Sequence, residues 1–191
     1  MEEFYLDGTL YYGRPQSAAN RLDKEMACYD LLDRLEIPFA RADHSPAGTI
    51  EMCEAVERVL GEKVCKNLFL CNRQKTDFYL LMLDGAKVFK TKDLSRQLGT
   101  ARLSFAGPEE MERFLHVTPG SVSVLGLMND GENRVQLVMD RSVAEAEQVS
   151  CHPCINTSTI RFAMEDLLHR FLPAVHHAPV FVDLPDPEEG A

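Results

Sequence analysis

The chain has 191 residues, of which 45% are hydrophobic and 26% are charged, and its formal net charge is −10 at pH 7. This composition is typical of one folded domain and excludes a disordered chain and a membrane-spanning protein. The acidic balance also argues against a broad surface for nucleic acid. The sequence after Met1 lacks the basic and then apolar pattern of a signal peptide, so we expect a cytoplasmic protein without a membrane partner.

Helical patterns dominate the first third of the chain. Residues 1–16 contain Tyr, Gly and Pro and are expected to form an extended segment packed on the surface. Apolar residues at helical spacing predict a helix over 17–35, and a polar loop follows at 43–48. Thr49 is a suitable N-cap for a second helix, which Gly61 ends.

Strand patterns dominate from residue 67 onwards, with short helices between them. The polar segment 72–77 is typical of a hairpin turn, and 129–133 is a second turn between two strands. Because strands and helices do not alternate strictly, the pattern predicts a mixed sheet in a single α+β domain. The predicted strands are 67–71, 78–83, 103–105, 122–127, 135–139, 157–162 and 180–183, and the predicted helices are 92–98, 108–115 and 164–172.

Lys66 is a lone ammonium in the apolar run from Val64 to Asn72. A lysine within such a run either extends its charged end to water or serves a function. Desolvation would lower its pKa, whereas nearby acceptors or a bound phosphate would hold its charge. A solvated lysine on the open face of a strand is an equally weighted alternative, so position alone assigns no role.

Positive charge is concentrated in one part of the chain. Nine Lys or Arg residues stand against three Asp between Lys63 and Arg102, although the whole chain is acidic. A local basic patch on an acidic body fits a protein that contacts one end of a nucleic acid. The simpler interpretation is a solvated face, as charge clusters usually are.

The six cysteines do not indicate a disulfide scaffold in a chain of this length. Four of them lie in apolar patterns, where reduced thiols pack as small hydrophobic residues. Cys151 and Cys154 form a Cys-His-Pro-Cys motif, which admits a redox or zinc hypothesis. A redox motif usually opens a helix, and a zinc site needs a second ligand pair. The sequence indicates neither, so we expect no metal site.

Five short motifs carry a resemblance to a known family. They occur in the order Lys66–Leu70 (KNLFL), Arg102–Ala106 (RLSFA), Thr118–Val122 (TPGSV), Gly126–Asp130 (GLMND), and His152-Pro153 followed by Asn156-Thr157. Together they resemble the YbaK/prolyl-tRNA-synthetase-associated superfamily, and within it the free-standing prolyl-tRNA editing proteins. The resemblance implies an N-terminal extension over 1–20, an editing domain over 21–185 and an acidic tail over 186–191.

The resemblance implies a mostly antiparallel sheet or partial barrel surrounded by helices, and an activity in trans editing. Family members hydrolyse the ester of tRNA(Pro) mischarged with alanine, and we expect a positioned water to attack without a cofactor. A synthetase pocket shaped for proline excludes the smaller alanine weakly, because a missing methylene is worth only about 1–3 kcal/mol. A second site that admits alanine and excludes proline removes the error.

Site residues are also implied by the resemblance. Lys66 matches a required lysine that holds either the terminal phosphate or the developing oxyanion. His152 is placed to orient the substrate or relay a proton. Asn129 neighbours the site through its place in a family motif. The remaining residues that we expect to bind substrate are Asn67, His44 and the loop residues Gly120, Ser121, Val122 and Ser123.

Several alternatives remain open at this point. Cysteine is the nearest competing amino acid, so a Cys-tRNA deacylase is one alternative. Others are a non-catalytic aminoacyl-tRNA-binding protein and a thiol redox protein that uses Cys151 and Cys154. The expected partners are the acceptor end of mischarged tRNA(Pro) and, as a further candidate, prolyl-tRNA synthetase.

Overall fold

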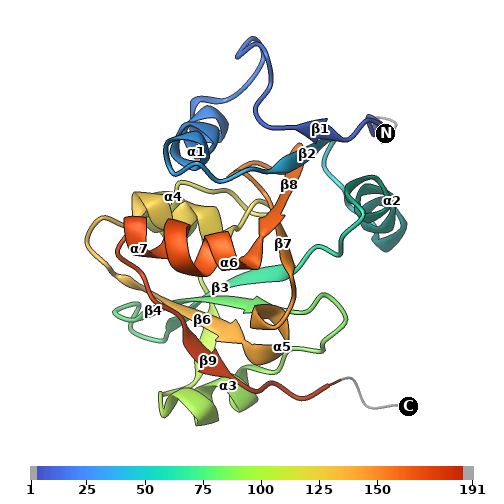
Figure 1. Ribbon diagram of the computed structural model, residues 1–191. Helices are drawn as coiled ribbons and strands as arrows, with labels where there is room; N and C mark the ends of the chain where they lie inside the picture. The colour runs from blue at the N-terminus through green and yellow to red at the C-terminus, as the bar shows by residue number, and fades with distance from the viewer. Residues whose placement is uncertain (1–3, 187–191) are drawn as a thin grey trace.

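The fold contains two β-sheets (Figure 1). The structure is a computed structural model that describes residues 4–186. The first sheet has the order β1-β2-β8-β7, and all its neighbours are antiparallel. Its strands are β1 (Tyr11–Tyr12), β2 (Ala40–Asp43), β7 (Gln148–Cys151) and β8 (Ser158–Ala163).

The second sheet has the order β5-β3-β4-β6-β9. Strand β3 is antiparallel to β4 and β5, whereas β6 is parallel to both β4 and β9. The α+β prediction is therefore confirmed, with two sheets instead of one, and within residues 4–186 there is no closed barrel. The strands are β3 (Lys66–Asn72), β4 (Phe78–Leu83), β5 (Leu103–Phe105), β6 (Val135–Asp140) and β9 (Val180–Val182).

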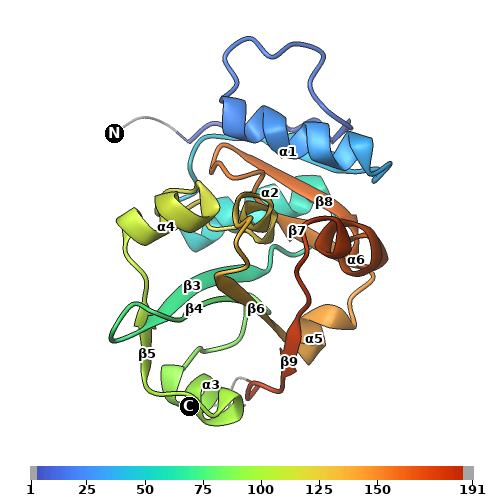
Figure 2. The ribbon, with the colours of Figure 1, turned by 90° about the vertical axis from the view of Figure 1, so that its left-hand side faces the viewer.

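Helices surround the two sheets (Figure 2). Helix α1 lies above the four-stranded sheet, α3 lies below the five-stranded sheet, and α4 and α6 lie at the level between them. No helix within the described residues is long and apolar enough to span a membrane. The α-helices are α1 (Asp23–Arg34), α2 (Ile50–Leu60), α3 (Thr91–Leu98), α4 (Pro108–Leu115), α5 (Arg141–Ala144), α6 (Met164–Asp166) and α7 (Leu172–Ala174).

Local sequence signals set several element boundaries as predicted. The Thr49 hydroxyl accepts a hydrogen bond from the Met52 N–H, which caps the start of α2. Gly61 and Gly99 adopt the left-handed conformation, with φ of 69° and 62°, and end α2 and α3. Pro108 occupies the first turn of α4, where a missing N–H costs nothing. The hairpin of β3 and β4 across residues 72–77 is also confirmed.

The predicted strand over 122–127 is wrong. Residues Val124–Asn129 form a 3₁₀ helix instead. The Ser123 hydroxyl accepts the Leu125 N–H, which favours this turn over extended backbone. Gly126 packs so closely on α4 that a Cβ there would lie 3.0 Å from the Leu115 Cβ. Tertiary packing thus overrides the β propensity of a Val-rich segment.

The first predicted helix begins later than its apolar pattern suggests. Helix α1 starts at Asp23 rather than at residue 17, because Asn20 has a positive φ of 63° that interrupts helical backbone. The predicted helix over 164–172 is continuous through α6, a π turn at Leu167–Phe171 and α7. The sequence analysis did not predict four short elements, namely β1, β2, β7 and α5. Strand β1 has two residues, and the other three elements have four each.

The five-stranded sheet is buried on both faces. Along β3, Phe69 faces the core between the two sheets, whereas Leu70 faces the cluster on the side of α3. Strand β4 alternates in the same way, with Leu80 on the first face and Leu81 on the second. Because both faces are buried, the sequences of these strands are continuously apolar and do not alternate between apolar and polar residues.

A buried ion pair fixes the C-terminal segment to this sheet. Lys87 Nζ lies 2.8 Å from Asp140 Oδ2 at the end of β6 and donates a 2.9 Å hydrogen bond to the Leu184 carbonyl. Only 8% of the Lys87 side chain and 1% of the Asp140 side chain are exposed. The acidic tail predicted over 186–191 lies, except for Asp186, outside the described residues.

Removing the buried carboxylate is expected to destabilise the fold. The Asp140→Asn variant leaves the Lys87 ammonium with only the exposed Asp186 carboxylate, 3.2 Å away, which costs about 3 kcal/mol of unfolding free energy. Arg141→Ala is the control, because the neighbouring Arg141–Asp183 pair is exposed and should contribute little. Urea unfolding of both variants measures the difference. Equal midpoints would show that the Lys87–Asp140 pair is not a major support.

Candidate functional site

Two connected hollows lie where the four-stranded sheet meets the start of β3. The inner cavity has a volume of about 120 Å³ and the outer one about 220 Å³. They share Val64, Gly120 and His152. The inner cavity is also lined by His44, Ala47, Cys53, Val56, Asn156 and Thr159, and the outer one by Cys65, Lys66, Asn67, Leu68, Val122 and Cys151.

A longer groove continues from these hollows along α2. Its volume is about 580 Å³, and it shares Val64, Cys65 and Lys66 with the outer hollow. Ile50 on α2 lines this groove and is 75% exposed. The inner cavity, the outer hollow and the groove thus form one continuous concave surface with Lys66 near its centre.

Two histidines from different loops are joined through one hydroxyl. His44 follows β2, His152 follows β7, and Thr159 lies on β8. The Thr159 Oγ1 is 2.8 Å from His44 Nε2 and 3.4 Å from His152 Nδ1. The ring centroids of His44 and His152 are 6.1 Å apart. Pairing of β2 and β7 with β8 therefore brings these side chains together.

The hydrogen-bond partners fix the tautomers of both rings. The Nδ1 of His44 is 2.8 Å from the Ser45 carbonyl, and the Nδ1 of His152 is 2.8 Å from the Ser158 carbonyl. A carbonyl only accepts, so each Nδ1 carries the proton and each Nε2 is an acceptor in the neutral ring. The Thr159 hydroxyl donates to His44 Nε2, whereas no hydrogen bond reaches His152 Nε2 within residues 4–186.

Burial keeps both imidazoles neutral near pH 7. Desolvation lowers the pKa values of both His152 and His44 below the ordinary value of 6.5. The hydrogen bond to Ser158 opposes this shift for His152, but burial is the larger effect. A neutral His152 with an available Nε2 lone pair is suited to accept a proton in the shared cavity wall.

Lys66 lies at the exposed first position of β3. Its Nζ donates a 3.1 Å hydrogen bond to the Lys87 carbonyl, and its side chain lines both the outer hollow and the α2 groove. The desolvation considered from the apolar run does not occur, because the run starts at the open end of the strand. The Lys66 side chain therefore lies at the rim of the hollow, where an anionic group can approach.

Asn67 connects β3 to the loop that carries Gly120. Its Oδ1 accepts a 3.0 Å hydrogen bond from the Val124 N–H, and its Nδ2 donates to the Cys65 carbonyl at 3.3 Å. Both ends of the amide are therefore occupied by the protein itself. Asn67 lines the outer hollow, and its contacts indicate that it holds the Gly120 loop in place.

The Gly120 loop has a constrained backbone. Gly120 has a φ of +86°, and a Cβ there would lie 3.4 Å from Asn156 Nδ2, so other residues would be strained. The Ser121 hydroxyl is buried and donates to the Thr118 carbonyl at 2.9 Å. Of the four expected loop residues, Gly120 and Val122 line the hollows, whereas Ser121 and Ser123 are fully buried and shape the turn.

Asn129 lies apart from the residues described above. It ends the 3₁₀ helix, and its Nδ2 donates to the Leu115 carbonyl of α4 at 3.0 Å. It lines neither hollow, so its visible role is to hold that helix against α4.

The cysteine motif shows no signs of redox activation. Cys151 and Cys154 are buried, and burial raises the pKa of the Cys151 thiol well above its ordinary value. A thiol needs an accessible thiolate to act as a nucleophile or metal ligand. Within residues 4–186, no group of three or more His, Cys, Asp or Glu side chains is arranged to hold a metal ion.

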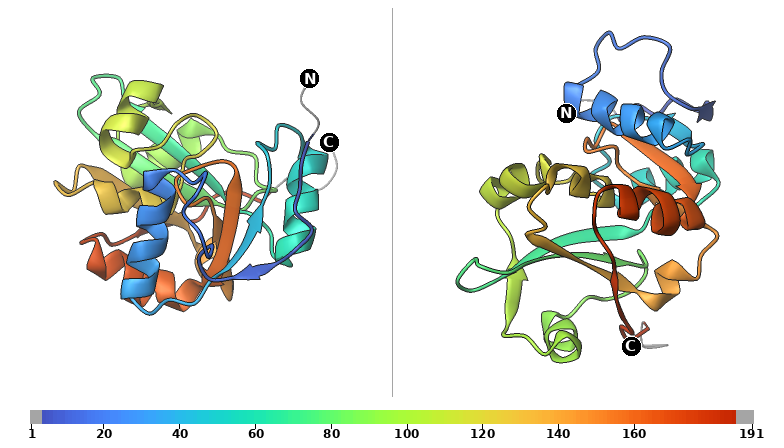
Figure 3. Two further views of the ribbon diagram at one scale, coloured as in Figure 1. Left: turned by 90° about the horizontal axis from the view of Figure 1, so that it is seen from above. Right: turned by 60° about the vertical axis from the view of Figure 1, so that its left-hand side comes forward.

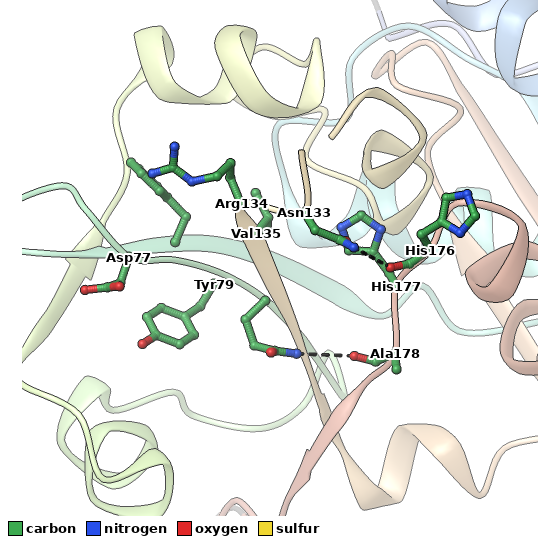
Figure 4. Close-up of a pocket in the computed structure, with 10 residues that line it drawn as sticks. Asp77, Tyr79, Asn133, Arg134, Val135, His176, His177 and Ala178 are labelled. Carbon is green, nitrogen blue, oxygen red and sulfur yellow. Dashed lines mark hydrogen bonds between the residues drawn. The ribbon is translucent and has the colours of Figure 1, made fainter. Parts of the chain in front are cut away.

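A further hollow lies at the opposite end of β4 (Figure 4). It has a volume of about 370 Å³ and is lined by residues around the starts of β4 and β6, including Tyr79, Arg134 and His177. His177 is buried, and its Nε2 lies 3.0 Å from Asp130 Oδ2. His177 has a packing role. The hollow that it lines is at the start of β4, whereas Lys66 pairs with Leu83 at the end of β4.

Several residues of the inner cavity were not predicted from the sequence. Thr159 links the two histidines, yet a threonine in a β-strand pattern is ordinary. Cys53 and Val56 of α2 form another part of the wall. Their helical spacing marked the apolar face of α2 but not the cavity that this face covers.

Comparison with known proteins adds independent findings. Residues 44–169 match the family model described as the aminoacyl-tRNA editing domain. The prolyl-tRNA editing protein ProX of Acetoanaerobium sticklandii is 32% identical over 146 residues, covering 76% of this chain and 89% of that protein. The prolyl-tRNA synthetase associated domain-containing protein 1 of Danio rerio is 30% identical over 168 residues, covering 87% and 90%.

A solved structure shares the fold. It belongs to a protein proposed as a trans-editing enzyme for prolyl tRNA synthetase, with a TM-score of 0.64 at 13% identity. The match covers 87% of this chain and 99% of that chain. At this identity the likeness shows the common fold alone.

The tautomer and charge of His152 can be tested directly. We expect nitrogen-detected NMR to show a neutral ring protonated at Nδ1, with a pKa below 6.5 because the site is desolvated. As the pH falls, His152 is protonated in the unfolded chain before it is protonated in the folded protein. The free energy of unfolding should therefore fall as the pH drops below about 6.5. A titration at or above 6.5, or a proton on Nε2 at pH 7, would contradict the assignment.

Proposed function

Because the chain belongs to the aminoacyl-tRNA editing domain family, we propose that it is a trans-editing deacylase that hydrolyses the ester of Ala-tRNA(Pro). It is a prolyl-tRNA editing protein by its relatives. The observation that supports the finer proposal is a small cavity whose wall contains a neutral histidine and whose rim contains a lysine. Its partner is the acceptor end of mischarged tRNA in the cytoplasm, with prolyl-tRNA synthetase as a second candidate partner.

The continuous concave surface suggests how the substrate lies. The alanyl group enters the inner cavity of about 120 Å³, which has room for a small side chain. The ester then lies beside Gly120 and His152, which both hollows share. The terminal nucleotide extends past Lys66 into the groove along α2, whose apolar surface suits a base.

The proposed reaction needs only a water molecule and the protein's side chains. His152 Nε2 takes a proton from the water as its oxygen attacks the ester carbonyl. The negative charge that develops on the carbonyl oxygen is stabilised by the Lys66 ammonium or by backbone N–H groups of the Gly120 loop. When the tetrahedral intermediate collapses, the ribose oxygen leaves with the proton from His152, and free alanine and intact tRNA result.

In this proposal, size selection depends on the part of the cavity wall that α2 supplies. Val56 and Cys53 of α2 line the inner cavity together with His44 and His152. Proline adds ring atoms that need further room, and a packed wall resists expansion. Cysteine is only slightly larger than alanine, so Cys-tRNA remains the alternative substrate that this cavity supports.

The central prediction concerns deacylation in solution. The purified protein should hydrolyse Ala-tRNA(Pro) and spare Pro-tRNA(Pro), and Lys66→Ala should lower the rate by about 10²-fold, as loss of one oxyanion donor does. Release of labelled alanine measures the rate. Lys75→Ala is the matched control, because this exposed lysine pairs with Glu110 away from the hollows.

The pattern of kinetic changes separates the two roles of Lys66. A lower kcat with an unchanged KM indicates the oxyanion, whereas a higher KM indicates a phosphate. Equal rates on both aminoacyl-tRNAs would contradict the specificity, and faster hydrolysis of Cys-tRNA would favour the alternative substrate. Tight binding without turnover would indicate a non-catalytic binding protein.

The pH dependence tests His152 as the general base. We expect kcat/KM to be constant above neutral pH and to fall on the acid side with an apparent pKa below 6.5, since protonation removes the Nε2 lone pair. His152→Gln should lower kcat/KM by about 10²-fold and abolish this acid limb. An unchanged acid limb in the variant would show that another group controls the rate.

A further inference from the structure

The N-terminal segment lies against the loop that carries His44. It runs antiparallel to residues 39–45, with Leu6 bridged to His44 and β1 paired with β2. Ser45 forms three hydrogen bonds with Tyr5 of this segment. Its N–H donates to the Tyr5 carbonyl at 2.8 Å, its Oγ accepts from the Tyr5 N–H at 2.9 Å, and its hydroxyl donates to the Tyr5 carbonyl at 3.4 Å. The Ser45 carbonyl in turn accepts from His44 Nδ1.

The same segment also packs against α2. Phe4, Leu6 and Leu10 contact a small apolar cluster that contains Val56 and Leu60 of α2. Figure 3 (left) shows the blue N-terminal segment running beside the teal helix α2. This cluster is separate from the two larger clusters around the five-stranded sheet. Residues 4–10, which we call the N-terminal clamp, therefore support α2 from outside the main core.

Helix α2 also packs on β2 and β8, but few of its side chains are buried. Val56 and Leu60 are its buried side chains, and both belong to the cluster that the clamp completes. Val56 also lines the inner cavity, so one side chain faces both the clamp cluster and the space proposed for the amino acid. A displacement of α2 would change the size of that cavity directly.

We propose that the N-terminal clamp is a specificity element: it holds α2 and the His44–Ser45 turn against the four-stranded sheet and so limits the amino acid that the cavity admits. The inference rests on the proposed deacylase function and extends it to a segment before the matched residues 44–169. A rigid wall excludes a larger side chain only when the wall cannot move, and small apolar clusters open more readily than large ones.

The test compares a clamp variant with a control in the same segment. Phe4→Ala/Leu6→Ala removes apolar contacts with the α2 cluster, whereas Tyr12→Ala alters a side chain of β1 that is 79% exposed and lies outside the cluster. Initial deacylation rates on Ala-tRNA(Pro) and Pro-tRNA(Pro) give the discrimination ratio. We expect this ratio to fall about tenfold in the clamp variant, as for a pocket loosened by one methylene, and to stay unchanged in Tyr12→Ala.

Hydrogen exchange provides a second readout that does not depend on activity. The amides of α2 should exchange faster in the clamp variant, while those of α1 and α4 should not change. Faster α2 exchange with an unchanged discrimination ratio would overturn the specificity role and leave a purely structural one. Unchanged α2 exchange would overturn the clamp itself. If the double variant fails to fold by circular dichroism, Leu6→Ala alone is assayed in the same way.

Failure of the proposed function has a different signature. A wild-type protein that hydrolyses none of the aminoacyl-tRNAs contradicts the deacylase proposal, and with it the specificity role of the clamp. The exchange of α2 amides still tests the physical clamp in that case. If the wild-type protein and the clamp variant have the same discrimination ratio for Ala-tRNA(Pro) over Pro-tRNA(Pro), only the specificity role of the clamp is contradicted.

Discussion

The hydrogen bond from the Val124 N–H to the Asn67 side chain joins two parts of the structure that are remote in sequence. Asn67 lies on β3, one residue after Lys66, and Val124 begins the 3₁₀ helix that follows the Gly120 loop. This bond places a backbone loop beside a lysine at the rim of the hollow. The relative position of the candidate oxyanion donors therefore depends on a single amide that is satisfied at both ends.

The histidine pair shows how a small network defines protonation states. Two carbonyl groups, of Ser45 and Ser158, accept from the Nδ1 atoms, and the Thr159 hydroxyl occupies only His44 Nε2. The two rings are similar in chemistry, but only His152 keeps an acceptor atom available to the cavity. We infer that His44 supports the wall and that His152 carries the proton transfer.

The wall that α2 contributes to the cavity rests on a smaller apolar cluster than the five-stranded sheet does. The five-stranded sheet is buried on both faces, whereas α2 rests on a cluster completed by the N-terminal segment. The cavity that we propose to distinguish amino acids by size thus has one side on the main core and one side supported from outside it. Such an arrangement concentrates specificity in a few apolar contacts.

The sequence by itself determined the elements whose signals are local. Thr49, Gly61 and Pro108 set helix ends because capping and φ preferences act within one turn, and the apolar runs 67–71 and 78–83 predicted the strands β3 and β4. The motifs around Lys66 and His152 predicted the family, which is confirmed, and the candidate site residues. Only the tertiary structure decided which of them meet. Thr159 and Val56 reach the cavity through strand pairing and packing between distant segments, and the N-terminal clamp contacts the cluster behind Val56. It also decided that residues 124–129 form a 3₁₀ helix, since close packing of Gly126 on Leu115 is a long-range contact that no local propensity encodes.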